Sequence, residues 1–278
     1  MNKIRALSIL NLAALSIHIF LSYATQFKLV NVKDVGEISN QYASLFTPAG
    51  FTFAIWGLIY LLLISFCIYH IIQAFVKTEL HPANRDTLKM GTWFIINNLG
   101  AAGWLLVWTN NQVSISAVLI LLQLISLIVI HSRLGIHDVK EKAGSKIFTQ
   151  LPLSIYFGWI TIATIANISV YLFSIQWDGF GLGYSAVTWT RIMIAVAAVI
   201  TMLVVLLRNN VAYGLVVIWA LYGIISKLKQ ADAAAYAVLI QTAWIALGIV
   251  TVACIIQLVK NIGTKKFRHR FPEAVPVK

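Results

Sequence analysis

The chain has 278 residues, of which 60% are hydrophobic and only 11% are charged, and its net charge is +12. Soluble domains carry about 25% charged and about 45–50% apolar residues. Because the apolar excess extends along the whole chain, the composition excludes a soluble globular enzyme and predicts an all-α integral membrane protein with several spans.

About twenty apolar residues are needed to cross the hydrocarbon core of a bilayer. On this measure the sequence predicts eight spans, at residues 6–27, 49–76, 90–109, 113–132, 149–174, 188–207, 211–227 and 233–259. The first apolar run is longer than the h-region of a signal peptide and has no small-residue cleavage site, so we interpret it as a retained helix.

Basic residues concentrate on one side of this eight-span topology. They lie before the first span, in the 77–89 and 133–147 loops, and in the basic tail at 261–278. The positive-inside rule then predicts that both termini are cytoplasmic, and we expect a bacterial cell membrane. Most of the net charge of +12 comes from these basic residues on one side of the membrane, so it does not indicate nucleic-acid binding.

The second span opens with the stretch TPAGFTFAIWGLIY, residues 47–60. Pro48 fits the first turn of a helix, where its missing N–H is not needed. Phe53, Trp56 and Tyr60 follow at i, i+3 and i+7, which predicts three rings on one helix face. Such a face is either a packing seam or the wall of a pocket for a flat apolar ligand.

The third and fifth spans carry similar stripes of aromatic and amide side chains. The members are Trp93, Asn97, Ala101, Trp104 and Trp108 in the third span, and Pro152, Tyr156, Trp159, Ala163 and Asn167 in the fifth. Indole N–H groups and amides inside a membrane need hydrogen-bond partners. The stripes therefore indicate either helix–helix contacts or a ring-lined ligand pocket with a few orienting amides.

The centres of the spans lack Asp, Glu, Lys and Arg. This argues against a proton relay or ion-coupled carrier, which places ionisable groups inside the bilayer. Cys67 and Cys254 are interpreted as packing residues. His70 and His131 lack metal-ligand spacing and are interpreted as interfacial residues rather than ligands of haem iron or a metal.

Two of these stripes match family motifs in the right order. Pro48, Gly50, Phe53 and Tyr60 fill one pattern, and Tyr156, Trp159, Ala163 and Asn167 fill the other. The chain thereby resembles the tryptophan-rich sensory protein family, the translocator-protein and peripheral benzodiazepine receptor (TspO/MBR) group. It departs from the pattern at Trp56, three residues after Phe53 instead of four, and at Ala101, where the family usually has Asn.

The resemblance implies a five-helix translocator-protein-like core at residues 1–175, whose pocket opens towards the first loop. Residues 176–260 then form a three-helix membrane extension, which covers the core or provides a homodimer surface. Ligands of the family include porphyrins, cholesterol and benzodiazepine-type drugs.

The leading hypothesis is a sensor, carrier or scavenger that binds a planar apolar ligand, porphyrin/tetrapyrrole-like or sterol-like, and requires no cofactor or metal. Lys28 and Lys33 in the first loop, or Arg191 at the mouth of the pocket, would meet the carboxylates of a porphyrin. The expected binding residues are Pro48, Phe53, Trp56, Tyr60, Asn97, Trp104, Trp108, Tyr156, Trp159, Ala163 and Asn167.

Two other functions stay open on the sequence. The first is a permease for a small uncharged or anionic solute, with a path lined by Asn97, Asn98, Gln123 and Thr164. The second is a light-dependent enzyme that degrades porphyrin through indole radicals. It ranks last because the sequence offers no acid, base, nucleophile or metal site for catalysis.

Overall fold

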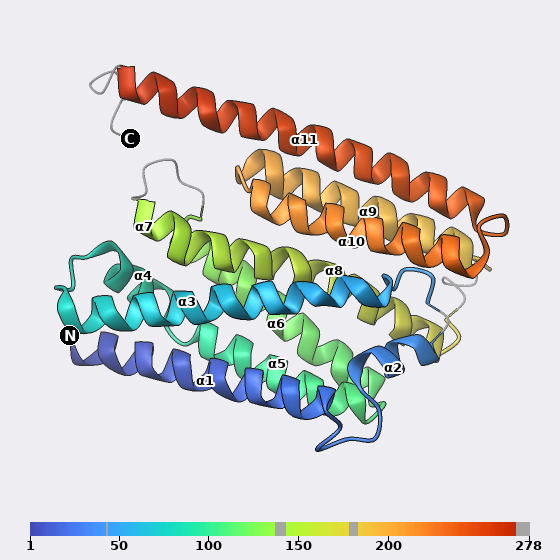
Figure 1. Ribbon diagram of the computed structural model, residues 1–278, viewed down its shortest axis with the longest axis horizontal. Helices are drawn as coiled ribbons and strands as arrows, with labels where there is room; N and C mark the ends of the chain where they lie inside the picture. Colours follow the sequence, from blue (N-terminus) through green and yellow to red (C-terminus); the bar gives the residue numbers. More distant parts are fainter. Residues whose placement is uncertain (43, 137–142, 178–182, 271–278) are drawn as a thin grey trace.

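The computed structural model describes residues 1–42, 44–136, 143–177 and 183–270, and these residues form helices and loops without a strand. The long helices run side by side (Figure 1): α1 (Asn2–Gln26), α3 (Ile55–Val76), α5 (Trp93–Thr109), α6 (Val113–Leu134), α8 (Leu151–Ser174), α9 (Ala186–Leu207), α10 (Val211–Asp232) and α11 (Ala237–Arg270). Shorter elements are α2 (Val35–Gln41), α4 (Pro82–Met90), α7 (Ala143–Ser145), a 3₁₀ helix η1 (Gly50–Ala54) and a π-helical turn η2 (Lys146–Gln150).

Within the described residues, seven helical segments are long and apolar enough to cross a membrane. Helices α4 and α5 would together form an eighth span, broken by a bend of 58°. The bend falls at Gly91, whose φ of +60° is a conformation that glycine adopts readily. The prediction of an all-α multi-pass membrane protein is confirmed, and the expected third span is the broken one.

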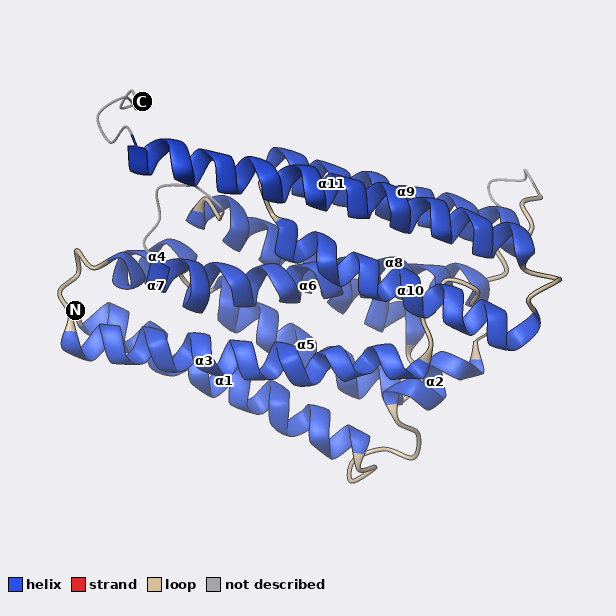
Figure 2. Cartoon of the chain, turned by 45° about the horizontal axis from the view of Figure 1, so that its top comes forward, coloured by secondary structure: helices blue, strands red, loops and turns tan. Residues whose placement is uncertain are grey.

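Helix α8 lies at the centre of the bundle. Its most apolar stretch is 78% buried, compared with 33% for the corresponding stretches in α9 and α11. Helices α1, α3, α5 and α6 lie on one side of α8, and α9, α10 and α11 lie on the other (Figure 1). Figure 2 shows α9 and α11 at the top of the bundle and α1 at the bottom. Helices α9 and α10 therefore pack directly on α8, which carries the second aromatic motif, and α11 packs on α9 and α10.

Helix α10 approaches α8 very closely at a glycine. A Cβ atom placed on Gly158 would lie 2.9 Å from the carbonyl oxygen of Tyr213, so only hydrogen fits there. Nearby, the amide of Asn210 donates a hydrogen bond to Ser154 Oγ at 3.1 Å. Small residues allow such contact between membrane helices, and interhelical hydrogen bonds strengthen it.

The 77–89 segment, expected as a loop, is largely the short helix α4. Pro82 occupies its first turn, and Ala83 and Thr87 are buried. The side chain of Asn84 donates to the carbonyls of Gln73 and Thr78 at 3.0 and 2.8 Å. These contacts satisfy carbonyls at and just beyond the end of α3, which explains why a polar segment folds back against the bundle.

At the other end of the chain, α11 continues to Arg270, into the segment expected as a tail. The remaining tail, 271–278, lies outside the described residues, as do the acidic residues expected in loops or the tail at Asp138, Glu141, Asp178 and Glu273. Figure 1 shows the N-terminus and the last turns of α11 at the same end of the bundle.

Candidate functional site

An aromatic cavity of about 360 Å³ lies among α1, α3, α5, α6 and α8, beside the start of α2. A side cavity of about 50 Å³ adjoins it. The two cavities share Val35, Phe53, Trp104 and Ala163. We call them the aromatic cavity and the side cavity.

Nine of the eleven expected binding residues line these cavities. Phe53, Trp56, Tyr60, Trp104 and Ala163 line the aromatic cavity. Pro48, Trp108, Trp159 and Asn167 line the side cavity, together with three of the first five. The structure therefore brings most of the three stripes to one place.

One wall of the aromatic cavity comes from η1 and α3. Trp56 and Tyr60 stack with ring centroids 5.3 Å apart, and Trp56 also meets Trp159 edge-on at 6.3 Å. Phe53 lies in the 3₁₀ helix and Trp56 in the first turn of α3, and residues at i and i+3 share a face in either kind of helix. This geometry explains how Phe53 and Trp56 reach the same cavity with a spacing one residue shorter than the family pattern.

The expected position of Pro48 in the first helical turn is wrong. The 3₁₀ helix begins at Gly50, after Ala49, whose extended backbone has ψ of 151°. The amide of Ala49 instead donates to the carbonyl of Gly223 on α10 at 3.1 Å. Contact with another helix sets the start of this span, which the local sequence does not reveal.

Helix α5 contributes a pair of stacked indoles with different hydrogen bonding. The Trp104 and Trp108 rings lie 5.4 Å apart and are nearly parallel. Trp108 Nε1 donates to the carbonyl of Val35 in α2 at 3.2 Å. Trp104 Nε1 is buried and has no hydrogen-bond partner in the part of the chain that the structure describes. A buried, unsatisfied donor costs about 1–3 kcal/mol, so this N–H would gain from an acceptor on a ligand.

Helix α1 supplies cavity residues that the ring pattern missed. His18 is buried, with its Nδ1 3.1 Å from Asn98 Oδ1, and its ring meets Trp56 and Tyr60 edge-on at 5.9 and 5.5 Å. Ser22 accepts a hydrogen bond from the Tyr60 hydroxyl at 2.7 Å. His18, Ser22 and Gln26 follow a four-residue spacing, so a search for polar helix faces would have found them.

Two expected binding residues lie outside the lining of both cavities. Asn97 turns towards α6, where its amide donates to the carbonyl of Gln123 at 2.9 Å. Tyr156 is fully buried behind Trp56, with their ring centroids 6.1 Å apart. Asn167 lines the side cavity but donates to Ser116 on α6 at 3.1 Å. These residues support the aromatic wall or join helices.

Helix α2 closes one end of the aromatic cavity, which Asp34, Val35 and Gly36 line. Asp34 and Glu37 form a capping box, with both hydrogen bonds at 2.8 Å. Lys28 Nζ bonds to Glu37 at 2.7 Å. This bond, followed by the one from the Asp34 amide, lowers the pKa of Glu37, and the same Lys28–Glu37 bond raises the pKa of Lys28.

The cations expected near the ligand are placed differently from the prediction. Lys28 bonds to Glu37, and Lys33 bonds to the Gln41 side chain at 2.8 Å. Neither lysine is among the described residues that line the aromatic cavity, and Arg191 on α9 is not among them either. The acidic Asp34 lines the cavity instead, so its charge does not attract an anion.

Residues considered for metal binding or a transport path have protein partners. The ring nitrogens of His70 lie 2.9 Å from Thr87 Oγ1 and 3.0 Å from Thr149 Oγ1. Thr164 donates to the backbone of its own helix. Over the described ranges, no group of three or more His, Cys, Asp or Glu side chains gathers as a metal site.

The fold and the cavity define a polytopic helical membrane protein with an aromatic chamber beside its first-loop helix. Its sequence matches the profile of the TSPO-like protein family over residues 8–256. The chain therefore belongs to the TSPO-like protein family. The match continues beyond residue 175 through most of the last three helices. No curated protein and no solved structure matches the chain.

Proposed function

We propose that this TSPO-like membrane protein binds a planar, mainly apolar ligand of the tetrapyrrole class in the aromatic cavity, as a sensor, carrier or scavenger. The observation that carries the proposal is Trp104. Its indole lines both cavities, and its buried N–H has no partner among the described residues. An acceptor on a bound ligand would supply the missing hydrogen bond.

The shape and lining of the cavity support a flat ring system. Phe53, Trp56, Tyr60 and Trp104 present rings from η1, α3 and α5, and Ala163 on α8 leaves space opposite them. Aromatic pairs contribute about 0.5–1.5 kcal/mol each beyond area burial. The volume of about 360 Å³ suits a small ring compound. The side cavity adds only about 50 Å³, so part of a full tetrapyrrole would extend beyond both cavities.

From the charges around the cavity we infer that the ring system of the ligand, and not its carboxylates, supplies most of the affinity. Lys28 and Lys33 would have to leave Glu37 and Gln41 to meet ligand carboxylates. We therefore expect a neutral porphyrin ester to bind about as tightly as the free acid. Asp34 at the cavity end would also disfavour a buried carboxylate.

The proposal is tested by measuring Kd for protoporphyrin and its dimethyl ester with the full chain in lipid nanodiscs. We expect replacement of both Trp56 and Trp159 by Leu to weaken binding at least about tenfold, since two ring contacts are lost. Trp104→Phe keeps the ring but removes the N–H, and should weaken binding about fivefold to tenfold. Trp244→Leu is the matched control, because Trp244 is exposed on α11 and remote from the cavity.

Equal affinities for the unaltered chain, the double variant and Trp104→Phe would show that this cavity does not bind the ligand. A loss of binding in Trp244→Leu of the same size would show that the indole effects are not specific to the cavity. Thermal stability of each variant should be measured in parallel, so that a folding defect is not mistaken for lost affinity.

A further inference from the structure

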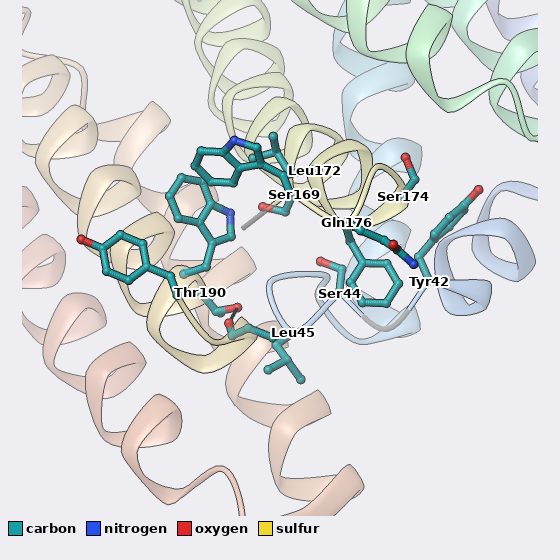
Figure 3. Close-up of a pocket in the computed structure, with 13 residues that line it drawn as sticks. Tyr42, Ser44, Leu45, Ser169, Leu172, Ser174, Gln176 and Thr190 are labelled. Carbon is teal, nitrogen blue, oxygen red and sulfur yellow. Dashed lines mark hydrogen bonds between the residues drawn. The ribbon is translucent and has the colours of Figure 1, made fainter. Parts of the chain in front are cut away.

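A third cavity, of about 650 Å³, lies where α8 ends and α9 begins, against Tyr42, Ser44 and Leu45 (Figure 3). It shares no described lining residue with the aromatic cavity or the side cavity. Because α9 provides part of its wall, it depends on the last three helices. We call it the α8–α9 cavity.

The apolar part of the α8–α9 cavity is built from aromatic side chains. Trp177 and Trp189 meet nearly edge-on, with centroids 4.7 Å apart and an interplanar angle of 70°. Phe173 and Tyr184 also line the cavity. Such an assembly presents both ring faces and ring edges to a ligand, and its volume lies in the range of small-molecule sites.

Two buried hydrogen-bonding groups in this cavity lack partners within the described part of the chain. Ser44 is only 8% exposed, and its hydroxyl has no hydrogen-bond partner. Figure 3 shows Ser44 between Gln176 and Leu45, with Thr190 farther to the left beside Leu45. Trp189 Nε1 is also buried and unpartnered. The hydroxyl can donate or accept, whereas the indole can only donate.

The described lining contains no Asp, Glu, Lys, Arg or His, although it includes serine and threonine hydroxyls and one amide. A charged ligand would lose hydration there without gaining a counter-ion. A neutral ligand with an oxygen acceptor would instead satisfy the indole N–H of Trp189 while its ring packs against aromatic side chains. The chemistry of the cavity thus favours neutral ring compounds that carry a carbonyl or hydroxyl oxygen.

We propose that the α8–α9 cavity is a second ligand site, for a neutral ring compound whose oxygen accepts a hydrogen bond from Trp189 and pairs with Ser44. Membrane quinones and sterols share this chemistry. The site is independent of the proposed function of the aromatic cavity, since the two have separate linings.

The test measures binding of a radiolabelled naphthoquinone and of radiolabelled cholesterol to the full chain in phosphatidylcholine nanodiscs. Trp189→Phe retains an aromatic ring without the donor, and Ser44→Ala removes the hydroxyl. Each should weaken binding about fivefold to tenfold. Ala186→Trp would fill the cavity from the exposed start of α9 and should abolish saturable binding. Trp244→Phe is the control, and Trp104→Phe reports binding of the same compounds in the aromatic cavity.

Binding of either compound that weakens in the three variants of the α8–α9 cavity and not in Trp244→Phe supports the site. The compound that binds shows whether the ligand is a quinone or a sterol. The proposal is overturned if neither compound binds saturably, or if binding survives Ala186→Trp unchanged. It is also overturned if Trp104→Phe weakens binding while the Ser44 and Trp189 variants do not, because the compound would then occupy the aromatic cavity.

Discussion

Trp219 on α10 donates its indole N–H to the backbone carbonyl of Thr52 in η1 at 3.1 Å, across a sequence separation of 167 residues. Thr52 belongs to the short 3₁₀ helix that also carries Phe53, a wall residue of the aromatic cavity. Helix α10 therefore holds one wall of the cavity in position.

Trp219→Phe should destabilise the protein by about 1 kcal/mol, since the ring is kept and one hydrogen bond to a backbone carbonyl is lost. The measurement is the thermal midpoint in detergent. Trp244→Phe serves as the control, because Trp244 is exposed on α11 and its ring lies over Lys229 rather than against η1. Equal midpoints for the two variants would contradict the prediction.

Gly223→Ala should be more damaging than the loss of this hydrogen bond. A Cβ there would lie 2.1 Å from Thr52 Cγ2 and 3.1 Å from Pro48 Cβ, so α10 would have to move away from the start of the second span. Overpacking of this kind costs about 1–3 kcal/mol. The thermal midpoint is again the measurement.

Gly248→Ala is the matched control for Gly223→Ala, because nothing lies within 4 Å of a Cβ built there. Alanine favours helix over glycine by about 1 kcal/mol, so this variant should hold or raise the midpoint. If both alanine variants behaved alike, close packing at Gly223 would not be the reason for the glycine.

Gly57 offers a way to fill the aromatic cavity without displacing a neighbour. It lines the cavity, and nothing lies within 4 Å of a Cβ added to it. We expect Gly57→Phe to lower affinity for protoporphyrin at least about tenfold by occupying ligand volume. Gly57→Ala should bind nearly normally and be up to about 1 kcal/mol more stable. Unchanged affinity in Gly57→Phe would show that protoporphyrin binds outside the aromatic cavity.

The anchoring of α2 should depend on pH through Lys28 and Glu37. The pKa of Glu37 is lowered in the folded protein, so its contribution is present above its ordinary value of 4.5 and is lost as pH falls through the lowered value. The pKa of Lys28 is raised, so its contribution is present below 10.5 and is lost as pH rises through the raised value. Both groups therefore contribute fully to the anchoring of α2 between pH 4.5 and pH 10.5.

Hydrogen exchange of the amides at residues 35–41, corrected for intrinsic rates, checks this expectation. Protection should fall between pH 7 and pH 3, while the amides of α6 keep theirs. Glu37→Gln removes the titrating group, so its α2 protection should be weaker at pH 7 and change less with acid. An identical pH response in the variant would exclude Glu37 as the responsible group.

Much of the architecture follows from local sequence. The lengths of the apolar segments predict the membrane spans, and the aromatic spacing in η1, α3, α5 and α8 places rings on faces that meet. Side chains three or four residues apart lie together on any helix, so this information is local. The same reasoning misplaced Pro48, because the first turn of its span is shaped by the carbonyl of Gly223, far away in the sequence.

The hydrogen bonding of the tryptophans depends on the tertiary structure. Trp108 and Trp219 find backbone carbonyls in other elements, whereas Trp104 and Trp189 have no partner among the described residues. An indole N–H is satisfied only if packing brings an acceptor within about 3 Å. The sequence does not display this packing, so the four indoles look equivalent there.

The sequence by itself therefore determined the class of protein, the apolar segments and the ring faces, through periodicity and hydropathy. Only the tertiary structure decided how α10 supports η1, and that α8 and α9 enclose another cavity. These features depend on the relative positions of helices, which are set by close packing at Gly158 and Gly223 together with long-range hydrogen bonds.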